Sequence, residues 1–415
     1  MPRRKGRPVR QFKRALCTLV LAACAHSTDS LPQTALPNSG AAAPTASYRK
    51  LFAFHGTPAG SEPTGTIVIH GELFGTTMGG GTKSLGTVFT RGLAGKVRIL
   101  HSFQGGHDGS QPEGGLVELN GVLYGTTAYG GTYGDGTVFA IATGGSEHVV
   151  YSFKGGADGA TPVLAGLVAL NGKLYGTTNA GGDSSCSYQS IAGCGTVFDV
   201  TPSGTEHVVY RFKGTPDGAC PSGSLLASGG VLYGTTNYGG TYNLGSVFKV
   251  TTSGQKTTLY SFKGYPDGVT PFGGLAELNG WFYGTTALGG AFQGAGTVFA
   301  LNSSGTYKVL HSFKGSPDGA LPYATLLPIG TSLYGTTELG GSSGASCVGR
   351  GIVGCGTVFS IGASGTLNVI YRFKGHKDGM NPLASLAVSG NGKVYGTTIG
   401  GGGFEDNGTI FEVTP

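Results

Sequence analysis

A short motif, an aromatic residue followed by Gly-Thr-Thr, recurs seven times along this chain of 415 residues. The copies begin at Phe74, Tyr124, Tyr175, Tyr233, Tyr283, Tyr334 and Tyr395, and successive copies are 50 to 61 residues apart. A second motif, Gly-[Thr/Ser]-[Val/Ile]-Phe, follows each copy in register. Self-similarity at a period of about 20–50 residues is typical of solenoids and propellers, in which each repeat is one supersecondary unit. The repeat therefore limits the fold more than any other feature of the sequence.

One repeat contains four β-strand patterns. In the second copy, residues 114–119 form a short apolar strand and Asn120-Gly121 a two-residue hairpin turn, because both residues tolerate positive φ. Further strands are expected over residues 122–127, 136–141 and 148–155. Glycine makes up 81 of the 415 residues, but it recurs at fixed offsets and therefore indicates turns. Propellers have about four to eight blades of four strands. The sequence predicts an all-β protein, a seven-bladed β-propeller with four-stranded antiparallel blades.

The two ends of the repeat array are complementary. The array begins at residues 48–54 with a fourth-strand sequence and ends at residues 410–413 with a third strand. The last blade therefore lacks an outer strand, and an open array would expose unpaired edges. We expect the N-terminal strand to complete the last blade and close the ring.

The first 47 residues indicate export. Seven basic residues in the first 14 positions precede an apolar stretch over residues 15–23, which is too short to span a bilayer but fits a signal peptide. Leu21-Ala22-Ala23-Cys24 resembles a bacterial lipobox, which predicts lipidation of Cys24; the alternative is ordinary cleavage at an Ala-x-Ala pattern. We expect a signal peptide with a lipobox over residues 1–24, a flexible linker over 25–47 and the propeller over 48–415.

The repeat resembles the GloVer tandem repeat of exported bacterial proteins. The matching elements are LYGTT, GG, GTVF and SFKGxxDG, and they cover residues 48–415. The resemblance implies an exported, surface-anchored protein, and it supplies no activity and no catalytic residues. With the lipobox, and with no aspartate directly after Cys24, it predicts a lipid-anchored protein of the cell envelope, at the outer membrane or cell surface.

The charge distribution argues against a nucleic-acid partner. Of the 27 basic residues, the seven in the export segment leave 20 against 21 acidic residues in the rest of the chain. The mature protein therefore has no bulk positive charge for binding nucleic acid. We expect a monomer that contacts the membrane only through its lipid anchor, and whose partner is a polysaccharide or an envelope protein.

The candidate ligand-binding residues lie in the longer loops. In a four-stranded blade, the loops from strand two to three and from strand four to the next blade share one face, and here these are the long loops. Residues there that do not recur in every repeat are better candidates than the scaffold, and aromatic rings can stack on sugars. The alternative is that the aromatics pack over glycine-rich loops. The candidates are His107, Tyr129, Tyr133, Tyr238, Tyr242, Phe292, His376 and Lys377.

Acidic residues and cysteines also recur. We expect the aspartate of each Asp-Gly pair to cap a turn; the alternative is a ring of carboxylates for a cation. The pairs Cys186/Cys194 and Cys347/Cys355 bracket equivalent insertions and predict two local disulfides, which suits an oxidising compartment. Zinc is disfavoured there because no histidine stands at finger spacing. Cys220 is left over. We expect no metal and no cofactor.

The sequence contains no linear catalytic signature, neither H-E-x-x-H nor a phosphate-binding loop. Our first interpretation is a non-catalytic surface protein that binds carbohydrate or protein through the loop-rich face. One alternative is a carbohydrate-active enzyme, a polysaccharide lyase or glycoside hydrolase, with its site at the channel mouth. A second alternative is a structural envelope protein.

Overall fold

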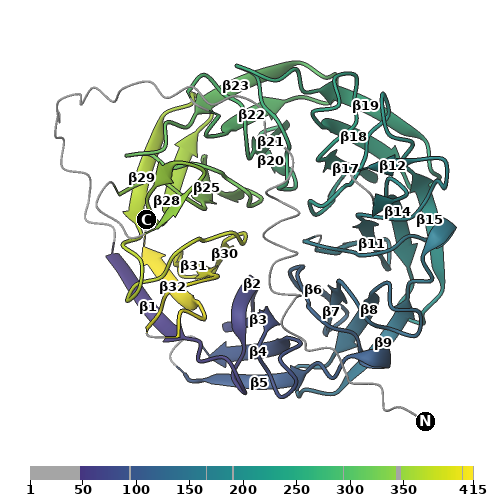
Figure 1. Cartoon of the computed structure of the whole chain (residues 1–415), viewed down its shortest axis with the longest axis horizontal. Helices are drawn as coiled ribbons and strands as arrows, with labels where there is room; N and C mark the ends of the chain where they lie inside the picture. Colours follow the sequence, from purple (N-terminus) through teal and green to yellow (C-terminus); the bar gives the residue numbers. More distant parts are fainter. Residues whose placement is uncertain are drawn as a thin grey trace, which may run out of the picture. The chain divides into compact units, whose positions relative to one another are not determined.

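A computed structural model describes residues 47–92, 95–164, 166–188, 191–292, 294–342, 347–403 and 405–414. The expected signal peptide, the lipobox and nearly all of the linker therefore lie outside the described residues. The part from residue 46 onward is one compact unit. It consists of seven four-stranded antiparallel sheets arranged in a ring (Figure 1), so the predicted seven-bladed propeller is confirmed.

The first four blades are consecutive in the sequence. Blade 1 contains β2 (Ser61–Ile69), β3 (Glu72–Gly79), β4 (Thr87–Gly92) and β5 (Val97–Ser102). Blade 2 contains β6 (Val117–Leu119), β7 (Val122–Thr127), β8 (Thr137–Ile141) and β9 (Glu147–Ser152). Blade 3 contains β10 (Val168–Leu170), β11 (Lys173–Thr178), β14 (Thr196–Val200) and β15 (Glu206–Arg211). Blade 4 contains β16 (Leu226–Ser228), β17 (Val231–Thr236), β18 (Ser246–Thr251) and β19 (Lys256–Ser261).

The remaining blades continue the same order up to the last one. Blade 5 contains β20 (Ala276–Leu278), β21 (Trp281–Thr286), β22 (Thr297–Leu301) and β23 (Tyr307–Ser312). Blade 6 contains β24 (Leu327–Ile329), β25 (Ser332–Thr337), β28 (Thr357–Gly362) and β29 (Leu367–Arg372). Blade 7 contains β30 (Ala387–Val388), β31 (Val394–Thr398), β32 (Thr409–Thr414) and, as its outer strand, β1 (Ser47–Ala53).

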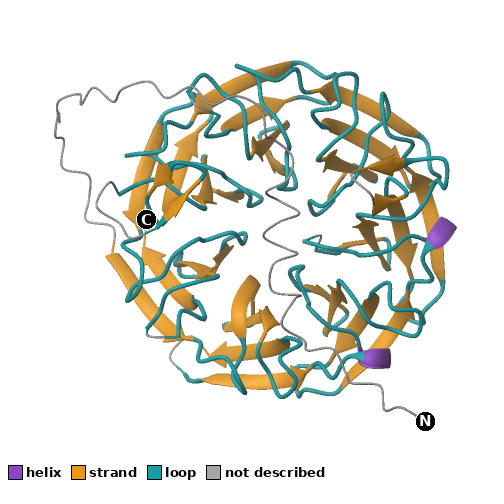
Figure 2. Cartoon of the chain, in the orientation of Figure 1, coloured by secondary structure: helices purple, strands orange, loops and turns teal. Residues whose placement is uncertain are grey.

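Four short strands and two helical turns lie outside the blades. The strands form two small hairpins, β12 (Ser187–Tyr188) with β13 (Ile191–Ala192) and β26 (Val348–Gly349) with β27 (Ile352–Val353). The 3-10 turns η2 (Gly106–Asp108) and η3 (Gly156–Asp158) follow the outer strands of blades 1 and 2 (Figure 2).

The ring closes through the N-terminal strand, as the sequence predicts. β1 pairs antiparallel with β32, with Tyr48 opposite Val413 and Lys50 opposite Phe411. The innermost strands border the central channel, while the outer strands run head to tail along the rim (Figure 1). The end of each outer strand therefore lies next to the start of the following one.

Phenylalanines join successive blades. The seven phenylalanines of the third strands are fully buried, and each meets the phenylalanine that follows the outer strand of the preceding blade. In the pair Phe103–Phe139 the rings meet edge to face, with centroids 5.2 Å apart. The pair Phe54–Phe89 makes the same contact between blade 7 and blade 1, at 5.3 Å. The expected packing between blades is therefore confirmed for these residues, and it rests on aromatic burial and edge-to-face geometry.

Candidate functional site

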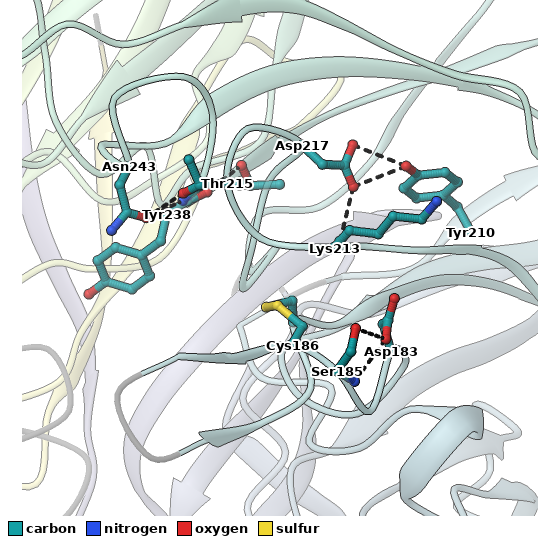
Figure 3. Close-up of a disulfide and its surroundings, with 12 residues drawn as sticks. Asp183, Ser185, Cys186, Tyr210, Lys213, Thr215, Asp217, Tyr238 and Asn243 are labelled. Carbon is teal, nitrogen blue, oxygen red and sulfur yellow. Dashed lines mark hydrogen bonds between the residues drawn. A yellow bond between two sulfur atoms is a disulfide. The ribbon is translucent and has the colours of Figure 1, made fainter.

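The recurring aspartate of each Asp-Gly pair closes the loop between two blades. Figure 3 shows the Asp217 carboxylate between the Tyr210 hydroxyl and the backbone amide of Lys213, both of which donate to it at 3.0 Å. The aspartate side chain thus accepts a hydrogen bond from the backbone amide four residues earlier, which confirms that it caps the turn as expected. The same arrangement recurs with Tyr or His as the aromatic partner at Asp108, Asp158, Asp267, Asp318 and Asp378.

The following blade adds a third residue to each junction. It is the residue that begins the next outer strand, and its chemistry differs around the ring. In chain order, from the junction after β1, these residues are Val97, Glu147, Glu206, Lys256, Tyr307, Leu367 and, at the closure, Tyr48. At Asp217 the added residue is a cation, because Lys256 Nζ lies 2.6 Å from the Asp217 carboxylate. The six junctions that contain the aspartate are therefore built alike but carry different charges, while the junction after β1 has Ala59 in its place.

The closing junction borders a hollow of about 520 Å³. Its lining includes Tyr48, Tyr371 and Asp378 together with two predicted site residues, His376 and Lys377. The structure therefore places these two candidates at the rim between blades 6 and 7. The hollow combines stacked tyrosine rings with basic side chains.

Three exposed aromatic side chains lie in neighbouring loops of blades 4 and 5. Tyr242, in the β17–β18 loop, is 54 % exposed, and Phe292, in the β21–β22 loop, is 44 % exposed. Tyr265, in the loop from β19 to β20, is 68 % exposed. Large apolar side chains seldom stay this open without a reason when they gather together. We call Tyr242, Tyr265 and Phe292 the aromatic band.

The loop that carries Tyr265 touches the two other loops of the band. A Cβ at Gly264 would lie 3.3 Å from a methyl group of Leu244, so these two loops pack together. On the other side, the Tyr265 hydroxyl lies against Gly294. The three loops therefore form one continuous surface on the loop-rich face.

The electrostatic surroundings of the band are basic. Lys314 Nζ lies 5.0 Å from the centre of the Phe292 ring, within cation–π distance. Lys263, in the loop that carries Tyr265, lies 5.8 Å from the Tyr260 ring. The band therefore presents apolar rings bordered by ammonium groups.

The structure places the other predicted aromatics in blades 2 and 4. Tyr133 is 57 % exposed and Tyr129 is 38 % exposed, both in the β7–β8 loop of blade 2. Tyr238 is buried, at 9 % exposed, so it presents no open ring to a ligand. The exposed His107 lies in η2, with Nδ1 3.3 Å from the Thr132 hydroxyl. The candidates thus fall into separate groups rather than one site.

Tyr265 is a band residue that the sequence analysis did not select. It stands in the segment between Gly264 and Asp267, which recurs in the other repeats without an aromatic residue at that position. The same criterion that selected Phe292, absence from the other repeats, would have found it.

A buried carboxyl group lies near the inner strands. Glu113 precedes β6, is 2 % exposed, and neither of its carboxylate oxygens has a hydrogen-bond partner. Burial, with a smaller contribution from Glu62, raises the pKa of Glu113 to about 8. A carboxyl group of this kind carries a proton at neutral pH, as a general acid must.

Both predicted disulfides are present. Cys186–Cys194 closes the base of the β12–β13 hairpin, and its sulfurs pack beneath the loop that carries Asp217 (Figure 3). Cys347–Cys355 does the same for the β26–β27 hairpin. Disulfides are typical of compartments outside the reducing cytosol. Within the described ranges no helix is long and apolar enough to cross a membrane.

Comparisons with known proteins agree with the repeat and the fold. The model of the Gloeobacter/Verrucomicrobia repeat matches residues 41–189 and 186–349. A comparison with curated protein sequences gives no match.

Solved structures similar to this chain have mixed functions. One is PorZ, a surface component of the type-IX secretion system of Porphyromonas gingivalis, with 15 % identity, a TM-score of 0.51, and coverage of 88 % of this chain and 48 % of that chain. Another, from Bacteroides uniformis, is described as a candidate 6-phosphogluconolactonase, with 16 % identity, a TM-score of 0.50, and coverage of 78 % and 88 %. The propeller domain of the Trilobed protease of Pyrococcus furiosus has 8 % identity, a TM-score of 0.44, and coverage of 81 % and 91 %. Identities this low show a shared fold and carry no function.

Proposed function

The chain belongs to the Gloeobacter/Verrucomicrobia repeat family, and we propose that it is an exported, non-catalytic propeller that binds a glycan across the aromatic band. The observation that carries the proposal is the gathering of Tyr242, Tyr265 and Phe292, each about half exposed or more, on three loops of which the middle one contacts both others. Sugar rings have apolar faces that stack on aromatic side chains, while their hydroxyls stay in water. A shallow band of rings suits a polymer better than a small molecule, which needs an enclosing pocket.

The bordering lysines favour a glycan with acidic groups. Lys314 places its ammonium group beside the Phe292 ring, and Lys263 stands two residues before Tyr265, so a carboxylate or sulfate substituent would be attracted there. Because such surface attraction is screened by salt, binding should weaken as the ionic strength rises. A neutral glycan would bind through stacking alone and would show little salt dependence.

The test compares single substitutions in the band with a matched control. The purified protein is titrated with a panel of acidic and neutral polysaccharides, and binding is measured by affinity electrophoresis and calorimetry. Tyr242→Ala and Phe292→Ala should each weaken binding about 2- to 12-fold, since one aromatic stack is worth about 0.5–1.5 kcal/mol. The control is Tyr133→Ala, which removes a similarly exposed tyrosine from the corresponding loop of blade 2. Equal losses in the control and the band variants, or no glycan bound by the native protein, would contradict the proposal and favour a protein partner or a structural role.

A carbohydrate-active enzyme is the second candidate, and Glu113 is the observation that favours it. Its raised pKa would keep a proton available for a leaving group, and Glu62 could supply a second carboxylate. The same titrations should be assayed for new reducing ends and for absorbance of unsaturated sugars. Product formed by the native protein and lost in Glu113→Gln would establish this candidate over the first.

We propose further that Cys24 carries the lipid anchor and that the protein is held at the outer membrane or cell surface. The support is the lipobox pattern at residues 21–24 and the two disulfides, which suit an oxidising compartment. Cys24→Ser should release the protein from the membrane fraction and abolish incorporation of labelled fatty acid. Incorporation that persists in this variant would exclude Cys24 as the anchor.

A further inference from the structure

The junction between blades 1 and 2 brings three metal-ligating side chains together. His101 ends the outer strand of blade 1, Asp108 lies in η2, and Glu147 begins the outer strand of blade 2. The His101 Nε2 atom lies 3.0 and 3.2 Å from the Asp108 carboxylate oxygens and 3.6 Å from Glu147 Oε2. One ligand atom from each residue lies within 4.8 Å of the others. The three groups therefore meet at one point, although they come from two repeats.

These separations match the coordination shell of a small cation. Ligand atoms bound at about 2.0–2.1 Å lie about 2.8–3.4 Å from one another around an octahedral or tetrahedral ion. The His101–Asp108 separation of 3.0 Å lies in this range and the His101–Glu147 separation of 3.6 Å is slightly longer, so an ion could enter with small side-chain movements. One imidazole and two carboxylates form a donor set that suits Zn²⁺ or Mn²⁺.

Glu147 provides an independent observation that points to a ligand. Its side chain is 8 % exposed, and its Oε1 atom is buried without a hydrogen-bond partner. A buried carboxylate oxygen without a partner is costly, and the usual compensation is a hydrogen bond or a metal ion. The side chains of His101 and Asp108 are about one-fifth exposed, at 20 % and 19 %, which leaves a path from solvent.

The other junctions show how the chain satisfies the same aspartate elsewhere. At Asp217 the third residue is Lys256, whose ammonium group lies 2.6 Å from the carboxylate. At Asp108 the equivalent position holds Glu147, which adds a negative charge where the other junction has a positive one. The two sites share the aspartate and its backbone-amide contact, so the Asp108 junction has a carboxyl group at the position where the Asp217 junction has an ammonium group.

We propose that His101 Nε2, Asp108 and Glu147 bind one divalent transition-metal ion, with Zn²⁺ as the expected occupant, and that this ion joins the outer strands of blades 1 and 2. The geometry of two ligands supports this role. The Asp108 carboxylate also accepts the backbone amide of Gln104, and the His101 ring meets Phe103 edge to face with centroids 4.9 Å apart. Outer-shell contacts of this kind orient ligands before the ion arrives.

The neighbouring junctions supply substitutions that the fold already tolerates. Blade 2 to blade 3 has Tyr151 in place of the histidine, so His101→Tyr converts the site to that arrangement and keeps a donor to the aspartate. At the next histidine junction, His311 pairs with Asp318 at 2.9 Å, but Leu367 occupies the position of Glu147. Leu367→Glu therefore builds a second site with the same three ligands.

The experiment measures the ion directly. The full chain, purified without a polyhistidine tag and dialysed against a chelator, is titrated with Zn²⁺ by calorimetry, and bound metal is counted by mass spectrometry after gel filtration. We expect one Zn²⁺ per native chain and two in Leu367→Glu. His101→Tyr and Glu147→Gln should each weaken binding at least 100-fold and remove the rise in Tm that Zn²⁺ produces. His311→Tyr is the matched control and should leave one Zn²⁺ bound.

Three results would overturn the proposal. The first is that the native chain binds no Zn²⁺ or Mn²⁺ at micromolar concentration. The second is that His101→Tyr still binds the ion. The third is that Leu367→Glu binds only one ion per chain. Circular dichroism and the Tm of the metal-free variants show whether each variant is folded. If His101→Tyr is not folded, Glu147→Gln tests the same site.

Discussion

Tyr48 stacks on Tyr371 with the ring centroids 4.0 Å apart and the ring planes 8° from parallel. Tyr48 lies in β1, the first strand of the chain, and Tyr371 lies in β29 of blade 6. The Tyr48 hydroxyl also donates to the backbone carbonyl of Asp378. This contact holds β1 in the last blade, where β1 is the one outer strand that no hairpin connects to the neighbouring strand of its own blade.

Removal of the Tyr48 side chain should loosen β1 and open the propeller where β1 pairs with β32. We expect Tyr48→Ala to lower the free energy of unfolding by about 2–4 kcal/mol, because a half-buried aromatic contact is lost. The matched control is Tyr307→Ala, which removes an equivalent stack on Tyr260, at 3.9 Å and 7°, from an outer strand, β23, that follows β22 of the same blade in the chain. Limited proteolysis should cut near β1 rapidly in the first variant and slowly in the second. Equal cleavage rates would contradict a special role for Tyr48.

Gly125 should not tolerate a side chain. It lies in β7, where an added Cβ would come within 2.6 Å of the Phe139 ring. Because Phe139 is fully buried and packs against Phe103, it cannot move away freely. Gly125→Ala should cost at least about 1–3 kcal/mol through overpacking. The control is Gly144→Ala in the same blade, where an added Cβ meets nothing within 4 Å. Chemical denaturation compares the two, and a neutral Gly125→Ala would show that the core adjusts.

Glu206 should make the protein less stable as the pH rises. Burial and the neighbouring Asp158 raise the pKa of Glu206 from 4.5 to about 8, with a smaller contribution from Asp199, while the Tyr151 hydroxyl opposes the shift. Below about pH 4.5 the carboxyl is protonated in both the folded and the unfolded state, so its stabilising contribution is fully present. Between pH 4.5 and 8 only the folded state retains the proton, and the contribution is lost progressively.

The measurement isolates this group by difference. The free energy of unfolding of the native protein and of Glu206→Gln is determined at pH 5 and pH 8. The native protein should lose about 1–3 kcal/mol relative to the variant over this range, since one pKa unit corresponds to about 1.4 kcal/mol. Parallel pH profiles would show that Glu206 ionises normally. Other carboxyl groups with raised pKa values are present in both proteins, so their contributions cancel in the difference.

Cys220 should be unreactive in the folded protein. It is 1 % exposed, and burial raises the pKa of its thiol to about 12, so almost no thiolate forms at neutral pH. Labelling with iodoacetamide, followed by peptide mass spectrometry, should modify Cys220 only after denaturation. Modification within minutes under native conditions would show that the loop opens, and Cys186 and Cys194 serve as disulfide-protected references.

Sequence patterns predicted the fold because its determinants repeat. The aromatic-Gly-Thr-Thr and Gly-Thr-Val-Phe motifs recur in register, so the seven blades, their four strands and the closing strand over residues 48–54 followed from counting them. Cys186 and Cys194 were predicted as a pair because they bracket an insertion within one repeat. These features depend on residues close together in the sequence.

The candidate site was less predictable because its members come from different loops. Tyr238 and Tyr242 are four residues apart in one glycine-rich loop, yet one is buried and the other is 54 % exposed. The loop path decides which ring faces solvent, and no repeat pattern encodes that path. Tyr265 is part of the band because its hydroxyl lies against Gly294 of the next blade.

The sequence by itself determined the number of blades, the strands in each and the way the ring closes, because hydrophobic alternation and turn residues act locally and recur in every repeat. The tertiary structure alone decided which groups meet where blades join. His101 and Glu147 belong to separate repeats, and each looks like an ordinary strand residue in its own. They lie 3.6 Å apart because the outer strands run head to tail around the rim, which places the end of β5 against the start of β9.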